Sequence, residues 1–241
     1  MHIHLSSVNS TNTVARELLK DQPFVIVSAD HQTAGRGRGG KTWEGDSGAN
    51  VYISFAHRVS SVVETTYVVA SMAYPTLAVS TAIRSLAPEM LVRIKYPNDV
   101  QVRVEQGWSK IAGILTEHEF EGSRCVATII GIGINVRQTV FPETISQPCT
   151  SLLLHNVDVS AEKVRCRIID EMFVYSQMAP FDAVAAWNKE LRLIGKSIRV
   201  IGSADVWIVE QLLDDGRLLI RNSTTLLERI IDNGDSIRYI D

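Results

Sequence analysis

Short apolar runs near the start of the chain predict strands, because they have the length of strands and are rich in β-branched and aromatic side chains. These runs lie at residues 2–5, 24–29 and 51–55. Between the first two, apolar residues at helical spacing up to Lys20 predict a helix that Ser10 or Asn12 caps. A glycine-rich stretch therefore joins the second strand to the third.

The middle of the chain changes from a helical pattern to a strand pattern. Apolar residues at helical spacing from about Val63 to Leu86 predict a long helix that covers one face of a sheet, with Pro75 as its one interruption. From Leu91 to Val136 short apolar runs alternate with turn residues, which is typical of an antiparallel meander. These patterns predict the α+β class.

Two further helices follow the meander. Ser160 can cap a helix that runs to about Met178. Pro180 begins another helix, which we expect to end at Gly195 with Phe181 on its apolar face. Both helices can cover the sheet.

The pattern changes again after the second of these helices. About five short strands follow, broken by glycine, asparagine and aspartate turns as far as Asn233-Gly234, and this arrangement suits a small barrel. No flexible linker separates it from the rest of the chain. We therefore predict a large domain at residues 1–195 and a small C-terminal β-barrel domain at residues 196–241.

Composition and charge narrow the function classes. The 241 residues carry 24 Lys and Arg against 27 Asp and Glu, so the chain lacks the basic field of a general nucleic-acid binder. Its three cysteines show no CxxC spacing, which argues against a disulfide framework and against a zinc site. No cationic leader and no stretch of about 18 apolar residues occurs. We expect a cytoplasmic protein that binds neither DNA nor membrane and has no metal-ligating set.

The segment Gly35–Lys41 combines four glycines with two arginines and a lysine. Glycines let the backbone approach a ligand and turn N–H groups inward, and the cations can pair with phosphate or carboxylate, so the segment predicts an anion cradle. It also satisfies GxGxxG, but a dinucleotide site requires a helix after the loop and here a strand follows. The absence of HRD and DFG motifs excludes a protein kinase. A flexible surface loop stays open at this point.

Two further motifs place lysines and glycines beside strands. In Lys95–Asp99 the Asn-Asp pair can turn the chain and leave side-chain oxygens facing a site. In Lys110–Leu115 a lysine begins an apolar strand that contains Gly113, and a glycine there often marks the close approach of a ligand or another backbone. Gly131–Val136 repeats the glycine pattern. An ordinary hairpin turn and a lysine at a strand edge are alternatives that stay open.

The motifs taken together, in order and spacing, resemble the signature of biotin protein ligases over most of residues 8–136. The family more often has tryptophan at the position of Tyr96, and this chain keeps an aromatic residue there. The signature begins close to Met1, which predicts a short form without the N-terminal DNA-binding domain of larger members. The motifs are Ser10-Thr11-Asn12, Gln32 to Gly40 with Trp43, Gly48-Ala49-Asn50, Lys95 to Asp99, Lys110 to Leu115, and Gly133-Ile134-Asn135.

The resemblance implies a fold, a reaction and a set of binding residues. The fold is a mixed, largely antiparallel sheet with helices on one face, followed by a small SH3-like β-barrel. The reaction activates biotin with ATP, accompanied by Mg²⁺, as biotinyl-5'-AMP and transfers biotin to a lysine of a biotin carboxyl carrier protein. The implied biotin-binding residues are Ser10, Thr11, Asn12, Gln32, Gly35, Arg36, Gly37, Arg38, Lys110 and Gly113. The implied ATP- or adenylate-binding residues are Arg36, Arg38, Lys41, Trp43, Lys95, Asn98 and Asn135.

Three residues are predicted to be catalytic. Joining two anions requires preorganised cations, and Arg38 and Lys110 are candidates for that role. The acceptor lysine must lose a proton before it attacks, and Asp99 is the carboxylate that we expect to help. A turn-capping role explains Asp99 equally well.

Other functions stay open on sequence alone. A lipoate or octanoyl ligase or transferase has the same broad fold, but the GRGRGG loop followed by KYPND and KIAGIL favours biotin. The set of cations argues against a non-catalytic biotin-binding module, and the acidic balance argues against a DNA-binding regulator. Edge strands of the meander could pair between subunits, so a homodimer is left open.

Overall fold

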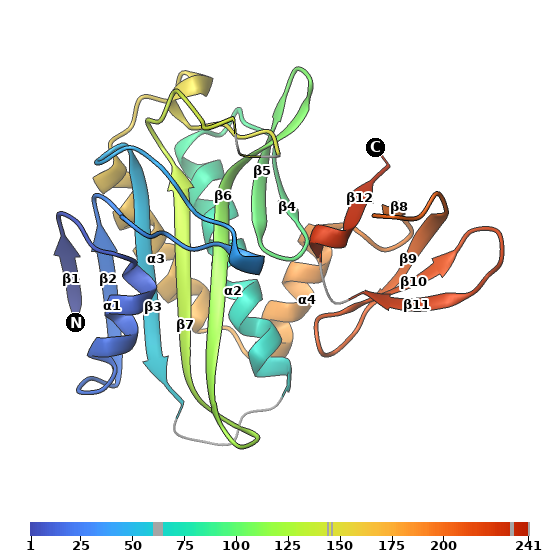
Figure 1. The fold of residues 1–241 in the computed structure, drawn as a ribbon, viewed down its shortest axis with the longest axis horizontal. Helices are drawn as coiled ribbons and strands as arrows, with labels where there is room; N and C mark the ends of the chain where they lie inside the picture. The colour runs from blue at the N-terminus through green and yellow to red at the C-terminus, as the bar shows by residue number, and fades with distance from the viewer. Residues whose placement is uncertain (60–64, 144, 146, 232–233, 241) are drawn as a thin grey trace.

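The computed structural model describes residues 1–59, 65–143, 145, 147–231 and 234–240. They form two sheets with helices packed between and around them (Figure 1). The first two residues of the predicted long helix, together with Asn233 and Asp241, lie outside the described residues.

The larger sheet is mixed and mostly antiparallel, as predicted. Its edge strand β1 runs parallel to β2, and every other neighbouring pair is antiparallel. The strands β4, β5, β6 and β7 are consecutive in the chain and adjacent in space, which confirms the meander. The strand order is β1 (His2–Leu5), β2 (Phe24–Ala29), β3 (Asn50–Arg58), β7 (Arg124–Asn135), β6 (Gly107–Glu121), β5 (Asp99–Val104) and β4 (Val92–Lys95).

Two long helices cover one face of this sheet, as expected, a third packs beside them against α2 and the edge strand β4, and a short one packs against the other face (Figure 1). The long helices are α2 (Thr65–Leu86), α3 (Ala161–Ser176) and α4 (Pro180–Leu191), and the short one is α1 (Thr11–Leu18). Ala15 of α1 is buried against Val25 and Val27 of β2, while Ile26 between them faces the long helices. This alternation of neighbouring residues is what a strand covered on both faces requires.

Helix α2 forms part of two hydrophobic cores. Ala78, Ala82 and Ile83 pack against the large sheet, whereas Val69 and Ala73 pack against the C-terminal sheet. By length and composition alone α2 could cross a membrane, and 67% of its most apolar window is buried within the fold.

The helix α2 runs through Pro75 without a break. Proline lacks the N–H that would bond the carbonyl of Ser71 four residues earlier. Thr116 of β6 donates its hydroxyl to that carbonyl instead, at 3.3 Å. The lost helical hydrogen bond is thus replaced by a contact to the sheet.

The C-terminal sheet has the five short strands that were predicted. They are β11 (Glu228–Ile231), β10 (Leu218–Asn222), β9 (Val206–Leu212), β8 (Ser197–Val200) and β12 (Ile237–Tyr239), in this order and all antiparallel. Within the described residues no pairing joins β11 to β12, so the sheet is open there. The proposed domain boundary between residues 195 and 196 stays a prediction.

The C-terminal sheet holds the hairpin turn between β4 and β5 through Tyr96. The backbone N–H of Tyr96 donates to the hydroxyl of Tyr239 at 2.9 Å, and the Tyr96 hydroxyl donates to the carbonyl of Gly216 at 2.8 Å. Burial raises the pKa of Tyr239 far above its ordinary value, so this hydroxyl stays protonated. The turn of the Lys95–Asp99 motif, which joins two strands of the larger sheet, therefore contacts the C-terminal sheet.

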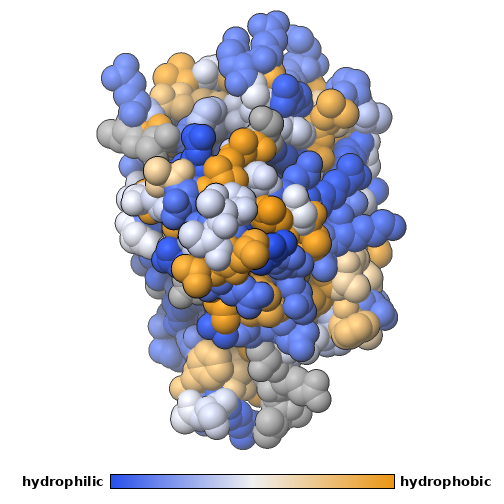
Figure 2. Space-filling model, turned by 90° about the vertical axis from the view of Figure 1, so that its right-hand side faces the viewer, coloured by the Kyte–Doolittle hydropathy of each residue, from blue (hydrophilic) through white to orange (hydrophobic). Residues whose placement is uncertain are grey.

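Helix α4 differs from the sequence prediction in two details. It ends at Leu191, with Arg192 in the left-handed region at φ 49°, rather than at Gly195. Phe181 is 76% exposed, because the buried face is centred on Ala183 and Trp187 and Phe181 lies about 140° away around the helix. Figure 2 shows the side of the molecule that carries the C-terminal sheet, where apolar and polar residues are interspersed.

Candidate functional site

The first residues of the site lie at the start of helix α1. Ser10, Thr11 and Asn12 are each at least 95% buried. Ser10 stands at the N-cap position but makes no side-chain cap bond, which corrects the predicted capping role. The oxygen Oε1 of Gln32 accepts the backbone N–H of Thr11 at 2.8 Å and its hydroxyl at 3.1 Å. Because Gln32 supplies the cap, the side chain of Ser10 is free to line the site.

A buried serine and a glycine hold Asn12 in place. The hydroxyl of Ser54 on β3 lies 2.7 Å from Thr11 Oγ1 and 2.6 Å from Asn12 Oδ1. A Cβ on Gly131 of β7 would overlap the Asn12 amide. The glycine at position 131 therefore makes room for a side chain of the protein itself.

The glycine–arginine loop is a small hairpin. The N–H of Gly37 donates to the carbonyl of Lys41 at 2.7 Å, and the N–H of Trp43 donates to the carbonyl of Gly35 at 3.0 Å. Gly39 at the tip has φ 63°, a conformation that glycine adopts without strain. Within the predicted cradle, Gly35–Lys41, the N–H groups of Gly37 and Lys41 bond inside the loop, and the loop presents its arginine side chains to the pocket.

Trp43 lies on a floor of two glycines. A Cβ on Gly113 of β6 would come within 2.7 Å of the indole, and a Cβ on Gly133 of β7 would overlap it as well. The two glycines face each other across neighbouring strands. We expected a ligand or another backbone near Gly113, and the structure places the tryptophan of the loop there. The indole Nε1 is buried, and no hydrogen bond to it is present in the described residues.

Lys110 forms a partly buried ion pair with Asp99. Lys110 Nζ lies 2.6 Å from Asp99 Oδ1, and the two side chains are 14% and 12% exposed. The ammonium group also lies 5.2 Å from the centroid of the Trp43 ring, within cation–π distance. The pairing register of strand β5 with strand β6, which carry Asp99 and Lys110, also shifts at this place, between Val100 and Gln101. The lysine, its counterion and the tryptophan of the loop thus meet at one point.

Asn98 connects the loop to the floor of the site. Its Oδ1 accepts from Arg38 Nη1 at 3.1 Å, and its Nδ2 donates to the carbonyl of Ile114 at 2.6 Å. The Tyr96–Pro97 peptide bond before it is cis. The turn between β4 and β5, predicted as a feature of the site, does bring Asn98 to the arginine of the loop.

These elements surround an open pocket with about 460 Å³ of empty space, part of which is open to solvent. Most of the predicted binding residues line it. Gly35 lies beneath Trp43, Asp99 lies behind Lys110, and Asn135 donates its amide to the carbonyl of Thr150 at 3.0 Å, so these three do not line the pocket. Lys41 and Lys95 are also outside the lining. The lining residues are Ser10, Thr11, Asn12, Gln32, Arg36, Gly37, Arg38, Trp43, Asn98, Lys110, Gly113, Ile114, Leu115, Gly131, Ile132 and Gly133.

The pocket carries cationic side chains over a thin, neutral floor. Arg36, Arg38 and Lys110 line it, and none of the lining residues is acidic. Such a site suits an anionic ligand with an apolar or planar part. Within the described residues, no group of three or more His, Cys, Asp or Glu side chains could hold a metal ion.

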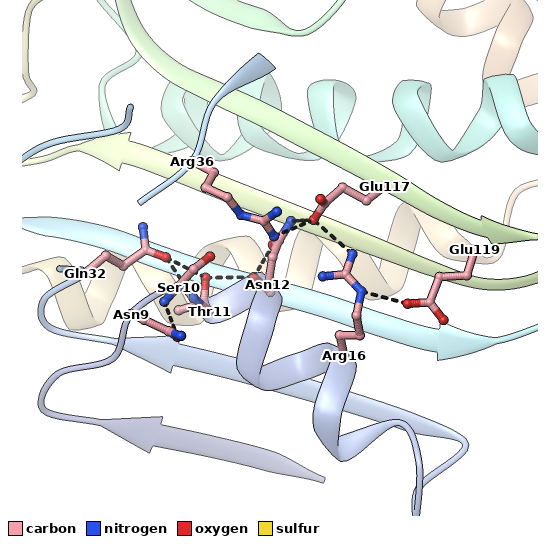
Figure 3. A network of polar contacts seen from close by, with 10 residues as sticks. Asn9, Ser10, Thr11, Asn12, Arg16, Gln32, Arg36, Glu117 and Glu119 are labelled. Atoms are coloured by element: carbon pink, nitrogen blue, oxygen red, sulfur yellow. Dashed lines mark hydrogen bonds and ion pairs between the residues drawn. The ribbon is translucent and has the colours of Figure 1, made fainter. Parts of the chain in front are cut away.

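One acidic residue next to the pocket was not singled out from the sequence. Glu117 of β6 accepts from Asn12 and Arg36 and pairs with Arg16 of α1, as Figure 3 shows. Ser54 beneath the pocket was also missed. A glutamate between Thr116 and His118, on a half-buried stretch of strand, offers no local signal, because its partners are far away in sequence.

Residues 5–135 match the sequence model of the biotin/lipoate A/B protein ligase family. A biotin-(acetyl-CoA-carboxylase) ligase of Mycobacterium tuberculosis is 31% identical over 214 residues, which are 81% of this chain and 73% of the relative. A bifunctional ligase/repressor BirA of Bacillus spizizenii is 34% identical over 154 residues, 62% of this chain and 45% of the relative. The chain thus matches less than half the length of that relative.

Solved structures show the same fold. A biotin protein ligase from Aquifex aeolicus in complex with biotin and ATP has a TM-score of 0.71 and 24% identity, with 99% of each chain covered. A biotin protein ligase from Leishmania major in complex with biotinyl-5-AMP has a TM-score of 0.62 and 22% identity, covering 96% of this chain and 98% of that one. Both likenesses extend over the large sheet and the C-terminal sheet.

Proposed function

Because the chain belongs to the biotin/lipoate A/B protein ligase family, we propose that it is a biotin protein ligase that uses ATP. The proposal rests chiefly on one observation, the cationic pocket over a glycine floor between α1 and the glycine–arginine loop. The similar ligases from Mycobacterium tuberculosis and Aquifex aeolicus support biotin as the ligand.

In the first step the carboxylate of biotin attacks the α-phosphorus of ATP, forming biotinyl-5'-AMP and releasing pyrophosphate. Both partners are anionic, and cations fixed in place stabilise the negative charge of the transition state without having to reorganise. Lys110 is held by Asp99 and Arg38 by Asn98, so both are preorganised. We assign Arg36, Arg38 and Lys110 to this task.

The second step transfers the biotinyl group to a lysine amine of a carrier protein, which forms an amide and releases AMP. The amine is mostly protonated near pH 7, since the ordinary pKa of lysine is about 10.4. Asp99 is the carboxylate that contacts Lys110, and it can take up this proton only when its ion pair with Lys110 opens. We keep Asp99 as the proposed base, with its contact to Lys110 as its other role.

Several further expectations belong to this proposal. The carrier is a biotin carboxyl carrier protein, the enzyme acts in the cytoplasm, and neither DNA nor a membrane takes part. Mg²⁺ is expected with ATP, and because it keeps several of its waters it would be held largely by phosphates and water.

Biotin-dependent exchange of pyrophosphate into ATP tests the first step directly. We expect exchange with biotin and none with lipoate or octanoate. Exchange with lipoate alone would identify a lipoate ligase, and the absence of exchange together with tight biotin binding would identify a binding module. Biotin incorporation into a purified carrier domain, against the same domain with its acceptor lysine changed to arginine, tests the second step.

A further inference from the structure

Glu117 stands at the end of the pocket floor without lining the pocket. It lies on the same strand face as Gly113 and Leu115, which do line it, because residues two apart on a strand point to the same side. Its carboxylate contacts two residues that line the pocket, Asn12 and Arg36 (Figure 3). Any effect of Glu117 on a ligand must therefore pass through these two side chains.

Three donors converge on one oxygen of Glu117. Its Oε2 lies 2.7 Å from Asn12 Nδ2, 3.1 Å from Arg36 Nη2 and 3.4 Å from Arg16 Nη2. The side chain is 23% exposed, so water screens these contacts only in part. A carboxylate in this setting holds charged and neutral donors more firmly than a neutral acceptor would.

The contact to Glu117 also decides how the amide of Asn12 points. Asn12 Oδ1 accepts from Ser54, and its Nδ2 donates to Glu117. An amide has one accepting and one donating end, and an ionised carboxylate only accepts, so Glu117 requires the Nδ2 end and leaves Oδ1 facing the Ser54 hydroxyl. Gly131 beneath it provides the space.

Arg36 is the first arginine of the glycine–arginine loop, and Glu117 ties it to the floor. Arg36 is 42% exposed and would otherwise sample many rotamers. Through Arg36 the carboxylate draws the hairpin from Gly35 to Trp43 toward helix α1, where Arg16 completes the network.

We infer that Glu117 is a positioning residue that orients Asn12 and Arg36 toward the ligand and fastens the glycine–arginine loop over the pocket. The effect on catalysis rests on the proposed function, whereas the fastening of the loop is a property of the protein alone. The two parts can be tested separately.

The kinetic test compares Glu117→Gln with the matched control Glu119→Gln. Glu119 lies on the same strand and pairs with Arg16 at 2.7 Å, but neither of these two residues lines the pocket. We expect Glu117→Gln to raise KM for biotin and to lower kcat, so that kcat/KM falls about tenfold at an unchanged melting temperature, since a misplacement of about 1 Å can cost up to a hundredfold in rate. Glu119→Gln should leave both constants unchanged. An equal effect of the two variants, or no effect of Glu117→Gln, would overturn the inference.

Limited proteolysis tests the fastening of the loop without reference to activity. Trypsin cuts after Arg36, Arg38 and Lys41, and cleavage follows the fraction of time that a segment is open. We expect these cuts to be at least about threefold faster in Glu117→Gln than in the unchanged protein and unchanged in Glu119→Gln, at equal melting temperatures. Equal rates in all three proteins would contradict the inference.

The two tests also separate the inference from the proposed function. If the unchanged protein shows no biotin-dependent exchange, the proposed function fails and the cleavage rates still decide whether Glu117 fastens the loop. Should Glu117→Gln not fold, Glu117→Asp keeps the charge on a shorter side chain, and loop cleavage at the unchanged rate would refute the fastening.

Discussion

Replacing Lys110 by methionine tests the central ion pair. The change keeps an unbranched side chain beside the Trp43 indole but leaves Asp99 without its partner at 2.6 Å. Breaking a fully buried pair by removing one partner costs about 3–5 kcal/mol. Because both side chains retain some exposure, 14% and 12%, we expect Lys110→Met to lower the free energy of unfolding by about 2–3 kcal/mol.

The double variant Lys110→Met/Asp99→Asn separates the charge from the packing. With both charges removed the buried carboxylate no longer lacks a partner, and the loss should fall below about 1 kcal/mol. Urea denaturation followed by tryptophan fluorescence measures both values, and pyrophosphate exchange should be lost in both variants. A stable single variant, or a double variant no more stable than the single one, would refute the reasoning.

Three further changes test other parts of the structure. Gly133→Ala should push the Trp43 indole off the pocket floor. Because a displaced group lowers the rate without unfolding the protein, we expect pyrophosphate exchange to fall at least about tenfold with little change in melting temperature. Exchange at the original rate would contradict this. Burial lowers the pKa of His57 and of His118, so the unfolded chain takes up protons at higher pH than the folded one. The free energy of unfolding, measured in urea titrations, should therefore fall as the pH drops below about 6.5. Glutamine at both positions should flatten that dependence. Tyr96→Phe removes the hydroxyl bound to the C-terminal sheet and should cost about 1–2 kcal/mol in thermal or urea unfolding, and a neutral effect would mean that water replaces it.

Much of the fold could be predicted because its signals are local. Strand runs, the meander turns and the helix started by Ser160 depend on neighbours in sequence, and Ser160 does accept the N–H of Lys163 at 3.2 Å. Phe181 was misplaced because a twelve-residue helix offers two overlapping apolar faces, and packing around Trp187 decides between them.

The site was less predictable, because its partners are distant in the chain. Asn12 and Glu117 are 105 residues apart, and Arg36 and Glu117 are 81 apart. Sequence spacing identified the glycines of the floor but not what lies on them. The cap at Ser10 was wrong for the same reason, since Gln32, 21 residues away from Thr11, supplies it.

The hydrogen bond that Tyr96 makes to Tyr239 of the C-terminal sheet has a consequence for the synthesis of the protein. Tyr239, which accepts the N–H of Tyr96, follows it by 143 residues. A ribosome that adds about 5–20 residues per second needs at least several seconds to reach it. Once Leu115 has been added, the growing chain contains the glycine–arginine loop and both lysine motifs, but until Tyr239 is made the turn between β4 and β5 lacks its hydrogen bond to that residue. The pocket thus reaches its final geometry late in synthesis, and a nascent chain stalled before β12 should bind biotin more weakly than the finished one.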